Sequence, residues 1–176
     1  MKPAAKRSVD LRAGNSQESG NTRSNATHSI TLRNLAERDF ETIYEIDQKC
    51  YPSEMAYSRR EFRWYLRLPA AEGIVAEVRG EIAGFILTAC FEHTGHIITI
   101  DVLPEFRRSR VGTKLLHAAE ESLTARGAKD IELETAINNA AAIEFWNRHG
   151  YLTRGILKNY YPGGLAAYAM MKRLES

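Results

Sequence analysis

The residues best suited to bind an anion lie in one short segment, Val102–Thr113. Its sequence, VLPEFRRSRVGT, has the form of a strand end, a short loop and the beginning of a helix. A helix N-terminus offers unpaired backbone N–H groups and a positive dipole end, which together suit a pyrophosphate. Arg107 and Arg108 add charge-assisted donors, and Gly112 allows a ligand to approach closely. An ordinary strand-to-helix turn with solvated arginines explains the same residues, and this segment alone does not separate the two interpretations.

The cysteines and the remaining histidines indicate neither a metal site nor a covalent nucleophile. Cys50 and Cys90 are too few and too isolated for a disulfide framework or a zinc cage. No His or Asn partner is spaced to activate either thiol. His93, His117 and His149 lack partners at ligand spacing, so we expect no metal.

Apolar periodicity and turn residues predict the elements that must position these side chains, in the order β-α-α-β-β-β-α-β-α-β-β. A capping box at Ser58 and Glu61 begins the second helix, and a tight turn at Arg79-Gly80 joins the second and third strands. The expected strands are 29–35, 73–78, 81–91, 96–103, 130–135, 151–160 and 165–173, and the expected helices are 36–50, 58–68, 111–126 and 140–149.

This order predicts an α/β fold with one mixed, mostly antiparallel sheet and helices on both faces. The helices after the fourth and fifth strands form crossovers, so we expect those two strands to be parallel neighbours. Ligands of such sheets bind at the carboxyl ends of the strands. The loops Leu103–Arg110 and Ala136–Asn139 are therefore the expected binding region.

The charges are divided unevenly along the chain. The 176 residues include 24 Lys and Arg against 22 Asp and Glu, and the net charge of +2 is too small to indicate binding to nucleic acid. Residues 1–28 hold five basic and two acidic residues and few large apolar ones, so we expect a disordered basic leader. An organelle transit peptide and a phosphate-seeking arm are further interpretations of this leader. Residues 29–176, with 19 basic and 20 acidic side chains, form the expected single domain.

The surroundings of the protein are indicated by composition as well. No apolar run approaches the roughly 20 residues of a membrane span, so we expect no membrane partner. The two isolated cysteines fit a reducing compartment, which predicts a cytoplasmic protein. Whether it is a monomer or a homodimer stays open.

A second segment reveals a family resemblance. LE at 133–134 is followed by NAAAI at 139–143, and then by Trp146 and the pair GY at 150–151. Together with the arginine-rich loop, these motifs resemble the GNAT family of acyl-CoA-dependent N-acyltransferases, and the resemblance extends from Ile30 to Leu174. It implies a GNAT-like fold and an acetyl-CoA site without metal, formed by Val102, Leu103, Arg107, Arg108, Ser109, Arg110, Val111, Gly112, Thr113 and Asn139.

Two positions depart from the family pattern. The first glycine of the family's phosphate loop is Arg110 here, so only Gly112 of the pair remains, and the Arg110 side chain must point away from the phosphate or wrap around it. The tyrosine that often protonates the departing CoA thiolate in the family is Trp146. Because indole has no proton that titrates near neutral pH, we expect Trp146 to pack in the core.

Three segments resemble the protein N-terminal α-amine acetyltransferases of this family, including the ribosomal-protein alanine type. These are CYPS at 50–53, the pattern from 133 to 146, and KNYYPG at 158–163 followed by AYAM at 167–170. The resemblance implies that Tyr51, Pro52, Tyr160 and Tyr161 contact a peptide N-terminus. The acidic residue that the family carries in this last hairpin is Ala166 here. A half-buried strand end also explains the paired tyrosines.

The same resemblance implies roles in acetyl transfer to an amine. Glu134 lies where the ribosomal-protein enzymes keep a catalytic glutamate, and it ranks ahead of His96, whose ordinary pKa near 6.5 also suits a base. A backbone N–H at Val102 or Leu103 is expected to polarise the thioester oxygen, and Tyr160 or its neighbour to supply the acid. A solvated strand end for Glu134 and an edge cap for His96 are the structural alternatives.

We therefore expect an enzyme that transfers an acetyl group from acetyl-CoA directly to a protein or peptide amine, with an N-terminal α-amine as the acceptor. A small-molecule amine acetyltransferase and a non-catalytic acyl-CoA-binding module are the alternatives.

Overall fold

The computed structural model describes residues 29–174, and the leader expected at 1–28 lies outside the described residues. The elements follow the expected order. The strands are β1 (Ile30–Asn34), β2 (Ala71–Val78), β3 (Glu81–Phe91), β4 (Thr94–Val102), β5 (Asp130–Ala136), β6 (Leu152–Leu157) and β7 (Ala167–Arg173). The helices are α1 (Phe40–Cys50), α2 (Arg59–Leu66), α3 (Val111–Ala125) and α4 (Ala140–Arg148), with 3₁₀ turns η1 (Glu37–Asp39), η2 (Pro104–Phe106) and η3 (Pro162–Gly164).

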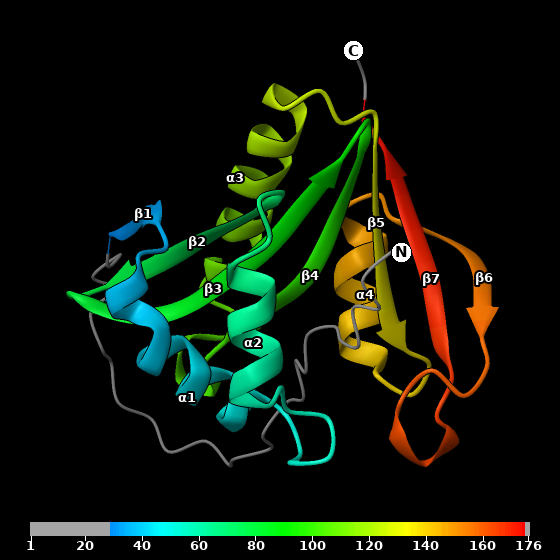
Figure 1. The fold of residues 1–176 in the computed structure, drawn as a ribbon, viewed down its shortest axis with the longest axis horizontal. Coiled ribbons are helices and arrows are strands. Elements are labelled where there is room, and N and C mark those ends of the chain that lie inside the picture. The colour runs from blue at the N-terminus through cyan, green and yellow to red at the C-terminus, as the bar shows by residue number, and fades with distance from the viewer. Residues whose placement is uncertain (1–28, 175–176) are drawn as a thin grey trace, which may run out of the picture.

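The strands form one seven-stranded sheet in the order β1-β2-β3-β4-β5-β7-β6 (Figure 1). Strands β4 and β5 are parallel, and every other neighbouring pair is antiparallel. The parallel pair is the one joined by the crossover helix α3, as the connection requires. The expected mixed α/β fold is therefore confirmed.

Local sequence signals account for two of the element boundaries. The Ser58 side chain accepts a hydrogen bond from the Glu61 N–H, and the Glu61 carboxylate accepts one from the Ser58 N–H at 3.0 Å, which completes the capping box of α2. The turn between β2 and β3 places Arg79 at φ 56° and Gly80 at φ 82°. Two consecutive left-handed residues are what a tight two-residue hairpin needs.

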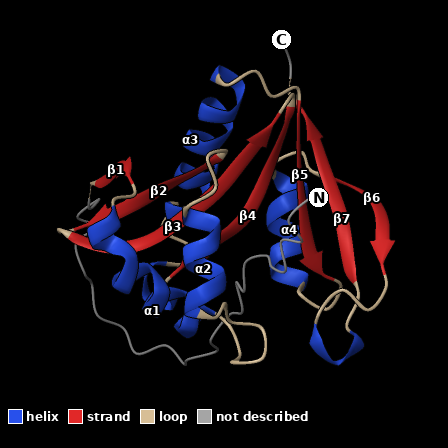
Figure 2. Cartoon of the chain, viewed as in Figure 1, coloured by secondary structure: helices blue, strands red, loops and turns tan. Residues whose placement is uncertain are grey.

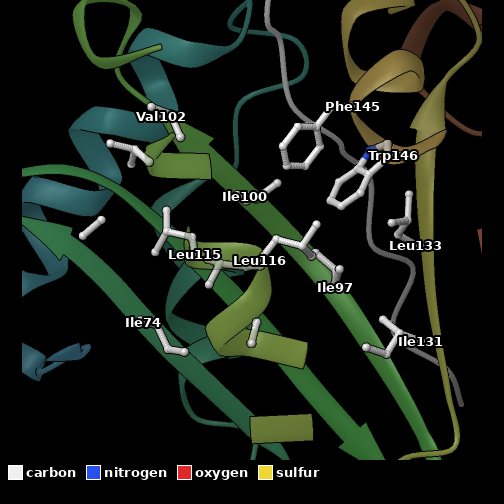
Figure 3. Close-up of a cluster of buried hydrophobic side chains, with 14 of the residues drawn as sticks. Ile74, Ile97, Ile100, Val102, Leu115, Leu116, Ile131, Leu133, Phe145 and Trp146 are labelled. Atoms are coloured by element: carbon white, nitrogen blue, oxygen red, sulfur yellow. The ribbon is translucent and has the colours of Figure 1, made fainter. Parts of the chain in front are cut away.

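Helices cover both faces of the sheet (Figure 2). Helices α1 and α2 pack on one face in a cluster that includes Phe62 and Val75, and α3 and α4 pack on the other in a cluster that includes Ile74, Leu115 and Trp146. Ile74 and Val75 are neighbours in β2 but belong to different clusters, because successive strand side chains point to opposite faces. Figure 3 shows the cluster under α3 and α4.

Strands β4 and β5 separate soon after they pair. Only residues 94–96 of β4 pair with residues 130–132 of β5. Beyond this point β4 carries a bulge, because Ile98 lies between the residues that pair with Leu87 and Thr88 and is itself skipped in the β3–β4 ladder. The two strands diverge like a V in Figure 1, so the sheet has a gap in its hydrogen bonding between their carboxyl ends.

The last hairpin differs from the expectation. Strand β6 ends at Leu157, whereas a strand was expected to run to Tyr160. Asn159 has φ 54°, and the Tyr161 N–H donates to the Leu165 carbonyl at 2.9 Å, which closes a loop. The paired tyrosines therefore lie in the β6–β7 loop and not at a strand end.

Candidate active site

Two arginines in the loop before α3 have a left-handed backbone conformation. The φ angle is 60° at Arg108 and 68° at Arg110, the residue that caps α3. The Lys114 N–H makes a helical bond to the Arg110 carbonyl at 3.0 Å, so the N–H groups of residues 111–113 have no partner within the helix. Because glycine adopts positive φ at least cost, the conformation of Arg110 explains why the family pattern has a glycine there. In this chain Arg110 adopts the positive φ itself.

A cavity of about 620 Å³ lies between the carboxyl half of β4 and helices α3 and α4. Its lining includes Arg107, Arg108, Arg110 and Arg148. Glu144, which also lines it, lies 3.7 Å from Arg148, measured between Oε1 and Nη2. Guanidinium groups beside a helix N-terminus have the charge and the donors that suit a polyphosphate.

The arginines of this loop are not equivalent. Arg107 Nε donates to the Val102 carbonyl oxygen at 3.0 Å, and Arg107 is half-buried. Arg108 and Arg110 are exposed. Arg107 therefore fastens the loop to the end of β4, and the exposed pair is more available to a ligand. The sequence pattern did not distinguish these two tasks.

The two candidate N–H groups at the end of β4 also differ. The Leu103 N–H donates to the Ala83 carbonyl at 3.0 Å and is therefore occupied. Hydrogen-bonded and non-hydrogen-bonded pairs alternate along an antiparallel ladder, so the next pair, Gly84 with Val102, directs the Val102 N–H away from β3. That direction is the gap left by β5. Of the two expected oxyanion donors, the geometry favours Val102.

A histidine, a glutamate and a tyrosine from three elements meet at this gap. Oε2 of Glu134, on β5, lies 3.1 Å from Nε2 of His96, on β4. This contact is close, although it lacks the alignment of a hydrogen bond. The Glu134 carboxylate is also close enough to Tyr160 of the β6–β7 loop to raise the pKa of its hydroxyl. The side chain of Glu134 is 15% exposed and that of His96 is 7% exposed, so Glu134 is the more accessible of the two.

Tyr160 is held in its protonated form. Burial is the main cause that raises its pKa, and the Glu134 carboxylate raises it further, with smaller effects from Tyr161 and Tyr57. A phenol that stays protonated at neutral pH can donate a hydrogen bond or a proton, but it cannot act as a base. In a proton transfer, Tyr160 is therefore suited to the role of donor.

Two loops approach each other beside this cluster. They are the α1–α2 loop, residues 51–58, and the β6–β7 loop, residues 158–166. Met55 of the first loop and side chains of the second loop pack against the same small buried apolar cluster. The buried members are Ala136, Tyr161 and Ala167, and Met55, Tyr160 and Leu165 pack against them.

The four residues expected to contact a peptide occupy different environments. Tyr160 lies beside the Glu134 carboxylate, whereas Tyr161 is buried and helps to join the two loops. Tyr51 is buried in the cluster beneath α1 and α2, and Pro52 is exposed. The structure therefore does not bring all four residues together, and Tyr160 is the one that lies next to the acid–base candidates.

Asn139 and Trp146 contribute to the position of α4. The Asn139 side chain accepts a hydrogen bond from the Ala142 N–H at 3.1 Å and caps the helix. Trp146 is fully buried beside Phe145 (Figure 3). Its ring centroid lies 5.0 Å from that of Phe145 and 5.2 Å from that of Tyr151. Trp146 thus packs in the core.

Neither cysteine is placed as a nucleophile. Burial raises the pKa of Cys50 to about 12, so its reactive thiolate is scarce at neutral pH. Cys90 lies on β3, opposite Gly95 of β4, where β4 still pairs with β5. Among residues 29–174, no group of three His, Cys, Asp or Glu side chains is arranged to hold a metal ion. The described helices also include none that is long and apolar enough to cross a membrane.

Sequence reasoning did not single out Asp47, Met55 or Tyr57, which hold the α1–α2 loop against its neighbours. Asp47 lies on the buried stripe of α1, in register with Ile43 and Cys50. A charged residue on such a stripe was a visible signal, because a buried carboxylate needs a partner. Met55 and Tyr57 carried no such signal.

Comparison with known proteins identifies the family. The model of the acetyltransferase (GNAT) family matches residues 40–151. The chain belongs to this family. As a GNAT protein with relatives named as N-acetyltransferases, it is an acyltransferase.

Three GNAT relatives illustrate the similarity. The N-alpha-acetyltransferase of Sulfurisphaera tokodaii is 29% identical over 152 residues, which cover 79% of this chain and 90% of the relative. The structure of the ribosomal-protein-S18-alanine N-acetyltransferase from Escherichia coli has a TM-score of 0.77 at 25% identity, over 84% of this chain and 96% of that one. The structure of Ard1 from Thermoplasma volcanium also has a TM-score of 0.77 at 25% identity, over 84% and 99% of the two chains.

Acetyl-CoA is the co-substrate of this GNAT enzyme, and the arginine-lined cavity fits it. Arg108 and Arg110 offer charge to phosphates, and the free N–H groups at the beginning of α3 offer hydrogen bonds. A Cβ on Gly112 would stand 3.6 Å from the Phe145 ring, an ordinary contact, so this glycine is not required by packing there. The thioester supplies the acetyl group.

Proposed function

We propose that this GNAT enzyme acetylates the α-amino group of protein or peptide N-termini, by direct transfer from acetyl-CoA while both substrates are bound. The contact between His96 and Glu134, at the point where β4 and β5 stop pairing, carries the proposal, because it supports a proton acceptor next to β4, the strand whose carboxyl half lines the cavity. Free α-amines have a pKa near 8, so modest assistance suffices for deprotonation. Two of the relatives described above are named for acetylation of an N-terminal amine or of a ribosomal-protein alanine.

Each residue of the cluster has a separate task in the proposed reaction. Glu134, the more exposed partner, accepts the proton from the attacking amine, and His96 holds and polarises the carboxylate. The Val102 N–H donates to the oxygen that gains negative charge in the transition state. Tyr160 donates its proton, directly or through water, as the thiolate leaves. The carbon–sulfur bond breaks as the carbon–nitrogen bond forms, so no residue of the chain is acylated.

The acceptor is tested with paired peptides. Each pair has the same sequence and one internal lysine, and differs only in whether the α-amine is free or blocked. We expect acetylation of the free peptide at its N-terminus, located by fragmentation mass spectrometry, and almost none of the blocked one. Equal acetylation of the two peptides at lysine would contradict the proposal, as would turnover of small amines alone.

A further inference from the structure

A buried carboxylate at the end of α1 holds the α1–α2 loop in place. Asp47 is fully buried, and its Oδ2 accepts hydrogen bonds from the Tyr57 N–H and from Gln48 Nε2, both at 2.9 Å. Gln48 Nε2 also donates to the Tyr57 carbonyl oxygen at 3.0 Å. The backbone of Tyr57 is thus tied on both sides to the last turn of α1, ten residues earlier. Burying a carboxylate costs several kcal/mol unless it is hydrogen-bonded, and the bonds from Tyr57 and Gln48 offset part of this cost.

Tyr57 lies between the end of α1 and the cluster of His96, Glu134 and Tyr160. Its ring is buried, and its centroid lies 5.8 Å from that of Phe62 and 5.3 Å from that of Tyr65 on α2. It is also one of the groups whose proximity raises the pKa of Tyr160. Met55, two residues before Tyr57, packs on the apolar cluster that contains Tyr161. The α1–α2 loop is thus anchored at Tyr57 and contacts the β6–β7 loop two residues earlier, at Met55.

The cavity for acetyl-CoA does not depend on this loop. Its described lining comes from residues 100–113 and 141–149, which belong to β4, α3, α4 and the segment before α3. A change in the α1–α2 loop should therefore affect the acceptor and leave acetyl-CoA binding intact. This separation makes the role of Asp47 measurable.

We infer that Asp47 is a positioning residue for the acceptor amine: through Tyr57 and Met55 it sets the wall of the acceptor site that faces Tyr160. This inference rests on the proposed function, since it requires an acceptor to bind beside Tyr160. Asp47 does not touch the reacting atoms.

Steady-state kinetics of Asp47→Ala and Asp47→Asn in the full-length chain test the inference. We expect Asp47→Ala to raise KM for the acceptor peptide about tenfold, because the loss of both hydrogen bonds at Oδ2 releases the backbone of Tyr57. KM for acetyl-CoA, and its Kd by calorimetry, should stay within about twofold of wild type. Asp47→Asn should restore most of the acceptor KM, because the amide oxygen still accepts the Tyr57 N–H.

A matched control separates positioning from general loss of stability. Asp39 is also a buried aspartate, at the other end of α1, where it binds Arg33 and the Ala36 N–H. Asp39→Ala should lower the melting temperature and leave both KM values near wild type. An unchanged acceptor KM in Asp47→Ala, or the same rise in Asp39→Ala, would overturn the inference.

Hydrogen exchange keeps the inference distinct from the proposed function. Asp47→Ala should speed amide exchange in residues 51–58 whatever the acceptor, because the Tyr57 N–H loses its partner. If the wild-type chain acetylates no peptide, the proposed function fails, and the exchange data alone then test the anchoring of the loop. If wild type is active but exchange in this loop is unchanged by the substitution, the role of Asp47 fails.

Discussion

Burial keeps both the Tyr160 hydroxyl and the Cys50 thiol protonated, yet their surroundings lead to different chemistry. Tyr160 lies beside the Glu134 carboxylate at the open gap, where a donor is needed when a thiolate leaves. Cys50, the last residue of α1, packs in the buried cluster between the sheet and helices α1 and α2, and its Sγ lies 3.5 Å from the Val102 carbonyl oxygen. The protonated Tyr160 hydroxyl can therefore donate a hydrogen bond at the gap, whereas the protonated Cys50 thiol in the core is unreactive.

Replacing Glu134 by Gln should lower kcat about 100-fold, because it removes the proton acceptor while keeping the shape of the side chain. Kd for acetyl-CoA should stay constant, since Glu134 is not among the residues that line the cavity. Single-turnover kinetics and calorimetry measure the two quantities. Wild-type turnover in Glu134→Gln would remove this residue from the mechanism.

Arg110 allows the effects of charge and of backbone conformation to be separated. Gly and Ala at this position both remove the guanidinium, so each should weaken acetyl-CoA binding by about fivefold, near 1 kcal/mol. At φ 68° the glycine variant should be more stable than the alanine variant by about 1 kcal/mol. Urea unfolding checks this order, which would be reversed if the residue had ordinary helical φ.

At the level of elements, ion pairs fasten the beginning of α1 to the edge of the sheet. Arg33 of β1 donates to Asp39 at 2.6 Å and to Glu77 of β2 at 2.8 Å, and Asp39 also accepts the Ala36 N–H. The Arg33 guanidinium is the main cause that lowers the pKa of Asp39 below its ordinary value, against the opposing effect of burial. The stability from this pair therefore depends on pH.

Asp39→Asn should cost about 2 kcal/mol of unfolding free energy at pH 7, where the aspartate is charged in both states. Because the folded pKa is lowered, this stability is complete above the unfolded pKa, near 4, and is lost as the pH falls through the folded value. The difference between wild type and variant should shrink below pH 4. Urea unfolding at several pH values would show this. A difference in unfolding free energy that grows in acid would contradict the lowered pKa of Asp39.

At the scale of the whole molecule, the gap between β4 and β5 is where the two halves of the site meet. The arginine-lined cavity is formed by β4, α3 and α4, while the α1–α2 and β6–β7 loops, which pack together, form the proposed acceptor side. Helices on both faces of the sheet hold these parts (Figure 2). The arrangement places the proposed acceptor beside the proposed thioester, so direct transfer requires no covalent relay through the chain.

Local signals in the sequence were sufficient for the element order, the capping box at Ser58, the Arg79-Gly80 turn and the arginine loop before α3. These depend on residues within a few positions of one another, where propensity and hydrogen bonding act directly. The motifs were also sufficient to predict the GNAT family, and Glu134, His96 and Tyr160 were named as catalytic candidates. Their chemical type and their family positions were enough for that.

Only the tertiary structure decided how these residues work together. The contact between His96 and Glu134 spans 38 positions and depends on where β4 and β5 stop pairing. The occupied N–H of Leu103 and the bond from Arg107 to the Val102 carbonyl depend on strand register and on the course of a loop. Asp47 acquires its role only because Tyr57 folds back onto α1. Sequence determines which groups are present, and long-range packing determines their distances, because no local preference encodes a contact between separate elements.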